Sequence, residues 1–243
     1  MNLKRHILNC TVATLSIVIS FSNAWGANTM SPATRPMVIE LFTSQGCNSC
    51  PAAEALLGEY VNNPDALILA FHVDYWDDLG WRDPFGLPIS NQRQQGYVQS
   101  LKLSSGFTPQ SVIDGQISLV GSDRRGLHTA LSVERNGIPI TLTKSDNMLS
   151  ITLPESTSST PFDVNLVAYQ KEAATPVRRG ENAGHTLKEY NIVRKFQKLT
   201  SWNGHATTMD VPLSRMGNGS NHIAVIIQQV NQGAIVGAAS LVL

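Results

Sequence analysis

Short apolar runs and amphipathic stretches alternate along the first half of the chain. Residues 37–43, MVIELFT, form an apolar run that ends at a turn-forming Ser-Gln-Gly and predicts a strand. Residues 50–61 carry a proline, Pro51, suited to a first helical turn and place their large apolar side chains on one face, which predicts a helix. The next apolar run, residues 66–75, is typical of a strand that is covered on both faces. Together these segments predict a βαβ unit.

A second helix, a hairpin and a third helix are predicted after a loop rich in Asp, Gly and Pro. The polar stretch 90–103 begins with a capping serine and predicts the second helix. Residues 109–121 place Asp114 and Gly115 between two apolar runs, which is a strong hairpin signal. Residues 122–135 predict the third helix, which ends before an Asn-Gly pair.

Beyond residue 137 the pattern changes to alternating apolar and polar positions in short segments separated by Ser, Thr, Asn, Gly and Pro. Such spacing is typical of an antiparallel sandwich. Residues 187–199 fit a long strand or a helix, and we favour the strand. The pattern therefore predicts an α/β domain over residues 36–136 and a β-rich, sandwich-like region over residues 137–243.

The N-terminus has the pattern of a secretory signal peptide. Lys4 and Arg5 precede an apolar run over residues 7–21, and small residues suited to cleavage follow as far as residue 26. We expect residues 1–26 to be removed and the mature protein to be periplasmic or secreted, with no membrane insertion after cleavage. An uncleaved anchor is the alternative. Cys10 lies inside the apolar run and would leave with the signal peptide.

Composition narrows the class of protein. Hydrophobic residues make up 42% and charged residues 15% of the 243 residues, as in an ordinary globular protein. The formal net charge is +0, and no basic stripe or aromatic-plus-arginine repeat occurs. Nucleic acid is therefore excluded as an expected partner.

Two cysteines remain in the mature chain, Cys47 and Cys50, in the motif Cys-x-x-Cys between a predicted strand and a predicted helix. This order of elements is that of thioredoxins, so the motif has the context that redox chemistry requires. A sulfur at a helix N-terminus is stabilised as the thiolate by unpaired N–H groups and the helix dipole. We expect Cys47 to be the nucleophile and Cys50 to resolve the mixed disulfide.

Three further residues are candidates for roles in exchange. Thr108 and Pro109 directly precede the predicted hairpin, where thioredoxins carry a cis-proline that faces the dithiol. The backbone of Thr108 would then pair with an incoming peptide. Glu40, on the first predicted strand, is a candidate acceptor for the Cys50 proton if its side chain faces that cysteine.

The loop after the central strand supplies two more candidates. Asp74 and Trp76 lie in an acidic, aromatic segment that is a possible rim of the active site, although carboxylates in such loops usually cap turns. His72 fits a satisfied core histidine better than a ligand. Arg178, Glu181 and their polar neighbours fit a solvated loop better than a binding edge.

The two cysteines also admit other interpretations. One is a structural disulfide, although so small a loop removes little chain entropy. Another is a Cu(I) clip formed by two thiolates. A four-ligand zinc site is excluded because the chain lacks the ligands for it, and no metal-binding residues are assigned.

Four stretches together resemble a family of exported bacterial proteins described as domain of unknown function 1223. These are ELFTSQGCNSCPAAEALL, HVDYWDDLGWRDPFG, FTPQSVIDG and RGENAGHTLKEYNIV. The resemblance covers most of the mature chain and implies a thioredoxin-like domain followed by a β-rich region. The resemblance to thioredoxins implies the roles of Cys47, Cys50 and Pro109. The pair between the cysteines, Asn48 and Ser49, departs from the thioredoxin Gly-Pro pair and leaves the direction of electron flow open.

The expected function is exchange between thiols and disulfides of proteins. No dissociable cofactor is expected, because the dithiol itself carries two electrons. A redox partner protein is expected, because the pair must be reset after each turnover. The alternative functions are a binding module with an inert disulfide and a Cu(I)-binding dithiol protein.

Overall fold

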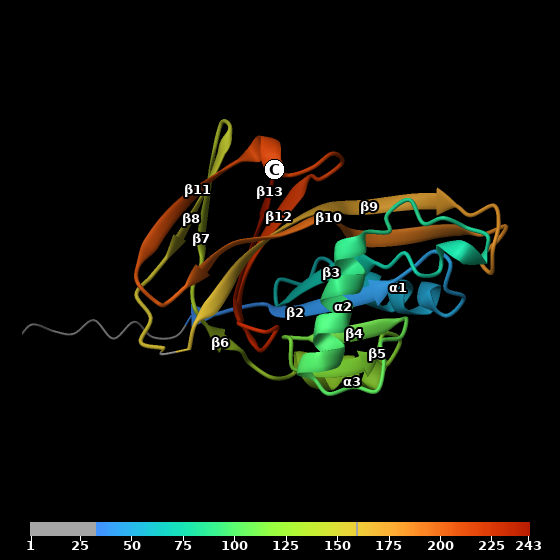
Figure 1. Cartoon of the computed structure of the whole chain (residues 1–243), viewed down its shortest axis with the longest axis horizontal. Coiled ribbons are helices and arrows are strands. Elements are labelled where there is room, and N and C mark those ends of the chain that lie inside the picture. The colour runs from blue at the N-terminus through green and yellow to red at the C-terminus, as the bar shows by residue number, and fades with distance from the viewer. Residues whose placement is uncertain (1–32, 159) are drawn as a thin grey trace, which may run out of the picture. The chain divides into compact units, whose positions relative to one another are not determined.

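Strands β2 (Met37–Thr43) and β3 (Ala66–His72) lie side by side in parallel at the centre of the main sheet. The computed structural model describes residues 33–243 except residue 159. Every residue of both strands is buried, as expected for strands that are covered on both faces. Helix α1 (Cys50–Gly58) connects them, so the predicted βαβ unit is confirmed (Figure 1).

The other elements predicted for the first half are also present. Helix α2 spans Pro88–Ser100 and helix α3 spans Arg124–Leu131. Strands β4 (Gln110–Ile113) and β5 (Ile117–Val120) form the predicted hairpin. Its turn residues, Asp114 and Gly115, have φ values of 48° and 69°, in the left-handed region that this pair adopts readily. The loop after β3 contains a short 3-10 helix, η1, over Asp77–Leu79.

The second half of the described chain consists mainly of strands. Its four longest strands, which join the main sheet, are β9 (Phe162–Pro176), β10 (Thr186–Trp202), β12 (His222–Gln229) and β13 (Ile235–Val242). A separate three-stranded sheet contains β7 (Thr141–Ser145), β8 (Met148–Leu153) and β11 (Thr207–Pro212). The shortest elements are β1 (Ala33–Thr34), its partner β6 (Asn136–Gly137) and the 3-10 helix η2 (Leu213–Arg215).

The predicted fold class, an α/β thioredoxin-like domain followed by a separate sandwich-like region, is wrong. The described chain is mostly β, with 43% of residues in strands and 17% in helices. One eight-stranded mixed sheet has the order β13-β12-β9-β10-β3-β2-β4-β5, so strands from both sides of residue 137 share it. The junction is a bridge between Ile192 of β10 and Ala70 of β3. The long strands of the second half extend the first sheet, so the second half is not a separate sandwich.

The helices cover opposite faces of the part of the main sheet that β2, β3, β4 and β5 form. Alternate residues of β2, such as Ile39 and Leu41, pack with α1 and α3. The residues between them, such as Val38 and Phe42, pack with Tyr97 of α2. The three-stranded sheet forms a further core with β9 and β12, in which Ile151 and Val225 are fully buried. Because side chains alternate along a strand, this arrangement fixes which β2 residues can face the cysteine helix.

Two expectations about the N-terminal region concern residues that lie outside the described part of the chain. These are the signal peptide, residues 1–26, and the loss of Cys10 with it. Within residues 33–243, none of the helices has the length and apolar character needed to cross a membrane.

Candidate functional site

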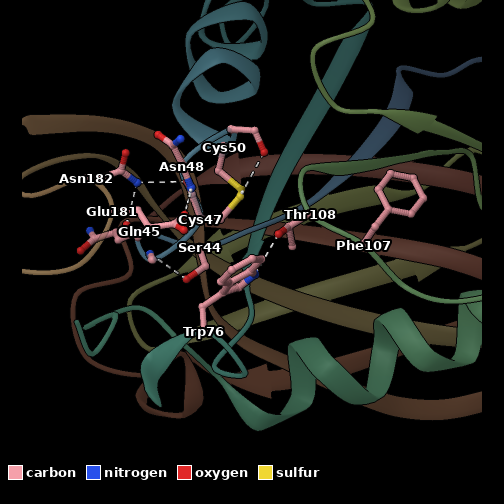
Figure 2. Close-up of a disulfide and its surroundings, with 12 residues drawn as sticks. Ser44, Gln45, Cys47, Asn48, Cys50, Trp76, Phe107, Thr108, Glu181 and Asn182 are labelled. Atoms are coloured by element: carbon pink, nitrogen blue, oxygen red, sulfur yellow. Dashed lines mark hydrogen bonds between the residues drawn. A yellow bond between two sulfur atoms is a disulfide. The ribbon is translucent and has the colours of Figure 1, made fainter. Parts of the chain in front are cut away.

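Cys47 and Cys50 form a disulfide at the junction between β2 and α1 (Figure 2). Cys50 is the first residue of α1, and Pro51 follows it in the first turn. Each cysteine is only 1% exposed, whereas Asn48 and Ser49 between them are exposed. In this state the sulfur atoms are covered, so a reagent reaches them only if the surrounding loops open.

The N-terminus of α1 is electrostatically suited to a thiolate. Ser49 occupies the capping position, but its side chain makes no capping hydrogen bond, and the first turn contains no acidic residue. The N–H groups and the positive end of the helix dipole are therefore not neutralised by a side chain of this turn. Such an environment favours an anionic group at this helix N-terminus.

The Thr108–Pro109 peptide bond is cis, which is the geometry expected from the sequence. Pro109 lies close to α1: the position that a Cβ would take at Gly121 is 2.9 Å from the Cβ atoms of both Pro109 and Ala53. Ala53 is one turn beyond Cys50 in the same helix. The structure therefore brings the cis bond and the start of the cysteine helix into one neighbourhood.

Trp76 joins this neighbourhood from the loop after β3. Its indole Nε1 donates a hydrogen bond of 2.9 Å to Oγ1 of Thr108. Its Cβ is 2.9 Å from the position that a Cβ would take at Gly46, directly before Cys47. Figure 2 shows the indole beside the disulfide with its nitrogen directed at Thr108. Trp76 thus lies against the cysteine loop and connects it to Thr108 through a hydrogen bond.

Asp74 has a different environment from Trp76. Its carboxylate accepts a hydrogen bond from the amide of Asn91 on α2, and its backbone N–H donates to Oδ1 of Asn91 at 3.2 Å. Asp74 therefore ties its loop to α2, and no recorded contact links it to the cysteines.

The side chain of Glu40 does not face Cys50, although the predicted role in accepting the Cys50 proton requires this. Its side chain is on the β2 face that packs with α2, opposite the face covered by α1. Nε and Nη2 of Arg93 donate to the two Glu40 carboxylate oxygens at 2.5 and 2.9 Å, and the hydroxyl of Tyr97 also donates to this carboxylate. Glu40 is a buried structural partner of Arg93 and is not placed to accept a proton from Cys50.

Glu54 is a buried acid near the cysteines that sequence reasoning missed. It is four residues after Cys50 on α1 and 6% exposed, and both residues line one cavity. Its Oε1 has no hydrogen-bond partner among the described residues. Burial raises the pKa of Glu54 to about 7, against the attraction of His72. The spacing of four residues between Cys50 and Glu54 could have identified this acid, because residues four apart lie on the same face of a helix.

His72 and Asp83 form a buried ion pair behind the cysteine loop. Nδ1 of His72 is 2.7 Å from Oδ2 of Asp83, and its Nε2 is 3.9 Å from Oε1 of Glu189 on β10. Burial alone would lower the pKa of His72, but Asp83, Glu189 and Glu54 raise it to about 9. The attraction of His72 holds the pKa of Asp83 below its ordinary value despite burial. His72 therefore carries a positive charge that faces three carboxyl groups.

The loop between β9 and β10 holds the cysteine loop from the second half of the chain. Nδ2 of Asn182 donates to the carbonyl oxygens of Gln45 and Cys47 at 2.9 and 3.0 Å. The backbone N–H of Asn48 donates to Glu181 at 3.1 Å. Figure 2 shows Asn182 and Glu181 on one side of the disulfide and Thr108 on the other. No local pattern predicts these contacts, because the partners are more than 130 residues apart.

Two elements border a cavity of about 630 Å³ next to the disulfide. Pro51, Glu54 and Ala55 of α1 form one wall, and Thr186–Tyr190 of β10 form the other. Cys50 lines the same cavity. Within residues 33–243, no group of three or more His, Cys, Asp or Glu residues is arranged to hold a metal ion. The expected Cu(I) alternative would use the two thiolates, which are joined here as a disulfide.

These features define a class of protein in which a mixed sheet carries a disulfide at a helix N-terminus and a loop from the second half closes over it. Residues 38–228 match the model of the family described as protein of unknown function (DUF1223). The chain belongs to this family.

One solved structure is similar over most of the chain. It is the X-ray crystal structure of protein AGR_C_4864 from Agrobacterium tumefaciens, with 28% sequence identity and a TM-score of 0.74. The match covers 85% of this chain and 93% of that protein. A search of curated proteins gave no match.

Proposed function

We propose that the protein exchanges disulfides with the thiols of other proteins through Cys47 and Cys50. The observation that carries the proposal is the position of this disulfide, at a helix N-terminus without a side-chain cap and near the cis Thr108–Pro109 bond. A cysteine in that position ionises readily, and the thiolate is the species that exchanges.

The exchange conserves atoms and electrons. A substrate thiolate attacks the sulfur of Cys47, forms a mixed disulfide and breaks the bond to Cys50, which leaves as a thiolate. A second substrate thiolate then attacks the mixed disulfide, so the substrate is oxidised to its disulfide and the protein keeps two thiols. The reverse sequence, in which Cys47 attacks a substrate disulfide and Cys50 resolves the product, reduces the substrate. A partner protein with a disulfide or dithiol resets the pair in an exported compartment.

Glu54 takes the proton role that the sequence suggested for Glu40. It lies one helical turn from Cys50 and shares a cavity with it. A group with a pKa of about 7 exchanges protons readily near neutral pH. Glu54 would take the proton of Cys50 when that thiol attacks, and would return it when Cys50 leaves.

The burial of both cysteines favours a second candidate function. A disulfide whose sulfurs are 1% exposed and whose loop is held by Asn182 fits a structural bond in a binding module. In that case the disulfide would hold the cysteine loop in shape, and the adjoining cavity would bind the partner.

The reduction potential of the Cys47–Cys50 pair tests both candidates. The mature protein is equilibrated with glutathione mixtures, and free thiols are trapped at each point. Exchange predicts a value between about −120 and −270 mV, the span of working oxidoreductases. A value well below about −300 mV would contradict exchange and support the structural disulfide. The variant Cys50→Ser, which has no pair to equilibrate, is the control.

A further inference from the structure

The edge of β10 beside the disulfide has no strand partner. Residues Thr186–Tyr190 pair with β9 on one side, whereas β3 bridges β10 only at Ile192. Apart from those of β9, no described residue makes a hydrogen bond to the backbone of this segment. In an antiparallel pair, alternate residues direct their N–H and C=O groups away from the partner strand, so this edge presents free donors and acceptors.

A groove runs along this free edge. All five consecutive residues of the segment line the cavity next to α1, although the side chains of a strand alternate between its two faces. The cavity therefore borders the edge of the strand and not one of its two faces. Along the edge, five extended residues span about 16 Å, and the cavity of about 630 Å³ lies within the usual size range of ligand sites.

The opposite wall contributes an acceptor that no protein group uses. Glu54 is 6% exposed, lines the groove and has an Oε1 atom without a hydrogen-bond partner among the described residues. A buried oxygen of this kind is costly unless a ligand or water donates to it. An extended peptide provides N–H groups along its whole length. The groove thus offers backbone partners on one side and a buried acceptor on the other.

We propose that the groove between α1 and the β10 edge binds an extended cysteine-containing peptide, which adds to the sheet as a strand beside the Cys47–Cys50 disulfide. The occupant is a peptide because a continuous row of backbone groups matches another backbone and asks little of the side chains. The segments of the substrate would be unfolded or exposed at loops, since only these are free to extend. This assignment names the substrate class of the proposed exchange. Exchange with the cysteine of this peptide rests on the proposed function, whereas binding of the peptide in the groove does not.

The binding experiment uses a decapeptide of threonine, serine and valine with a lysine at each end and a central serine in place of cysteine. Fluorescence anisotropy of the labelled peptide is measured with wild type and with Ala55→Trp, which fills the groove from an exposed helix position. We expect saturable binding that Ala55→Trp weakens by about tenfold or more. The matched control is Val133→Trp, which places the same side chain in a cavity of about 650 Å³ beside α3 and should not change binding.

A second peptide tests the strand geometry. Methylation of alternate backbone nitrogens removes donors without changing the side chains, and should abolish binding if the peptide pairs with β10. Failure of the wild type to saturate at about 1 mM peptide would overturn the inference. Binding that is insensitive to both Ala55→Trp and methylation would overturn it as well.

The exchange experiment separates the two proposals. The cysteine form of the peptide, as its mixed disulfide with glutathione, is compared with glutathione disulfide as substrate for the reduced protein. We expect Ala55→Trp to slow exchange with the peptide while the rate with glutathione disulfide stays within about twofold of wild type. Binding without any exchange would refute the proposed function and leave the groove assignment intact. Equal slowing of both substrates would refute the groove as a peptide site.

Discussion

Glu54 lies four residues beyond Cys50 on α1, and the two side chains line the same cavity. The arrangement puts a buried acid next to the Cys47–Cys50 disulfide without a salt bridge to neutralise it. His72, which is positively charged, attracts Glu54, while Glu189 repels it, and burial has the largest effect on its pKa. A proton on Glu54 is therefore held more tightly in the folded protein than in an ordinary exposed carboxyl group.

This relationship predicts the pH dependence of stability. The pKa of Glu54 rises from 4.5 to about 7 on folding, so the folded state binds this proton more tightly than the unfolded chain. Its contribution to stability is complete below about pH 4.5 and is lost as the pH rises through about 7. The loss amounts to at most about 3 kcal/mol. Glu54→Gln, which stays neutral, should remove this part of the pH dependence of the free energy of unfolding.

Urea denaturation of wild type and Glu54→Gln at several pH values between 4 and 8 measures the effect. The raised pKa of His72, about 9, produces a separate loss of stability between about pH 6.5 and 9, which should remain in Glu54→Gln because Asp83 raises this pKa more than Glu54 does. An exposed acid provides the control: Glu134→Gln should leave the pH dependence unchanged. Parallel curves for wild type and Glu54→Gln would show that Glu54 is not the group responsible.

The hydrogen bond between Trp76 and Thr108 should limit access to the disulfide. Thr108→Val keeps the shape of the side chain but removes the acceptor, so the loop should open more often. A hydrogen bond is worth about 0.5–1.5 kcal/mol, which corresponds to about a two- to tenfold increase in the population of the open state. We expect the rate of disulfide reduction by dithiothreitol to rise by this factor.

Thr152→Val is the matched control for this measurement. Thr152 pairs with Thr208 on the three-stranded sheet at 3.1 Å, so the substitution removes a hydroxyl contact in a different sheet. Its reduction rate should equal that of wild type. If Thr108→Val were reduced no faster than Thr152→Val, the hydrogen bond between Trp76 and Thr108 would not limit access to the disulfide.

The local elements were predictable because their signals are local. The apolar runs of β2 and β3 and the Asp114-Gly115 turn follow from periodicity and turn chemistry. Residues 187–199 fitted a strand or a helix, and the strand that we favoured lies within β10. The joint sheet was not predictable, because it depends on one contact between strands that lie more than 100 residues apart, Ile192 with Ala70. The hydrophobic pattern therefore changes near residue 137 although the sheet continues with strands from beyond that residue.

In the candidate site too, the features with local sequence signals were predictable and those that depend on distant contacts were not. The cysteine pair and the Thr108–Pro109 bond are recognisable from short motifs and lie together. Glu40 was misassigned because alternation along a strand tells which residues share a face but not which helix covers that face. The partner that settles its role, Arg93, is on α2 and 53 residues away.

The Glu40–Arg93 pair should stabilise the fold without taking part in exchange. Arg93→Met leaves a buried carboxylate without its partner and should cost about 3–5 kcal/mol of unfolding free energy. The double variant Glu40→Gln/Arg93→Met removes both charges, so it should recover much of that loss. Urea denaturation of the single and double variants measures the coupling. A double variant as unstable as the sum of the single variants would contradict it.

The pH profile of exchange separates Glu40 from Glu54. In the proposed mechanism Glu54 moves the Cys50 proton, so Glu54→Gln should alter the dependence of the exchange rate on pH near 7. Glu40→Gln should leave the shape of the profile unchanged as long as the protein remains folded. A changed profile in Glu40→Gln alone would return the proton role to Glu40.

Asn182 should be the main support of the cysteine loop from the second half of the chain. Asn182→Ala removes two donors and leaves the carbonyl oxygens of Gln45 and Cys47 without them, which should cost about 1–3 kcal/mol. The loss should show in urea denaturation and as faster hydrogen exchange at the amides of residues 46–49. Asn203→Ala, at an exposed position with a single weak contact of 3.5 Å, should have little effect on either readout. Equal effects of the two variants would mean that Asn182 does not support the loop, whereas a selective effect of Asn182→Ala would show that this residue of the second half of the chain controls the shape of the cysteine site.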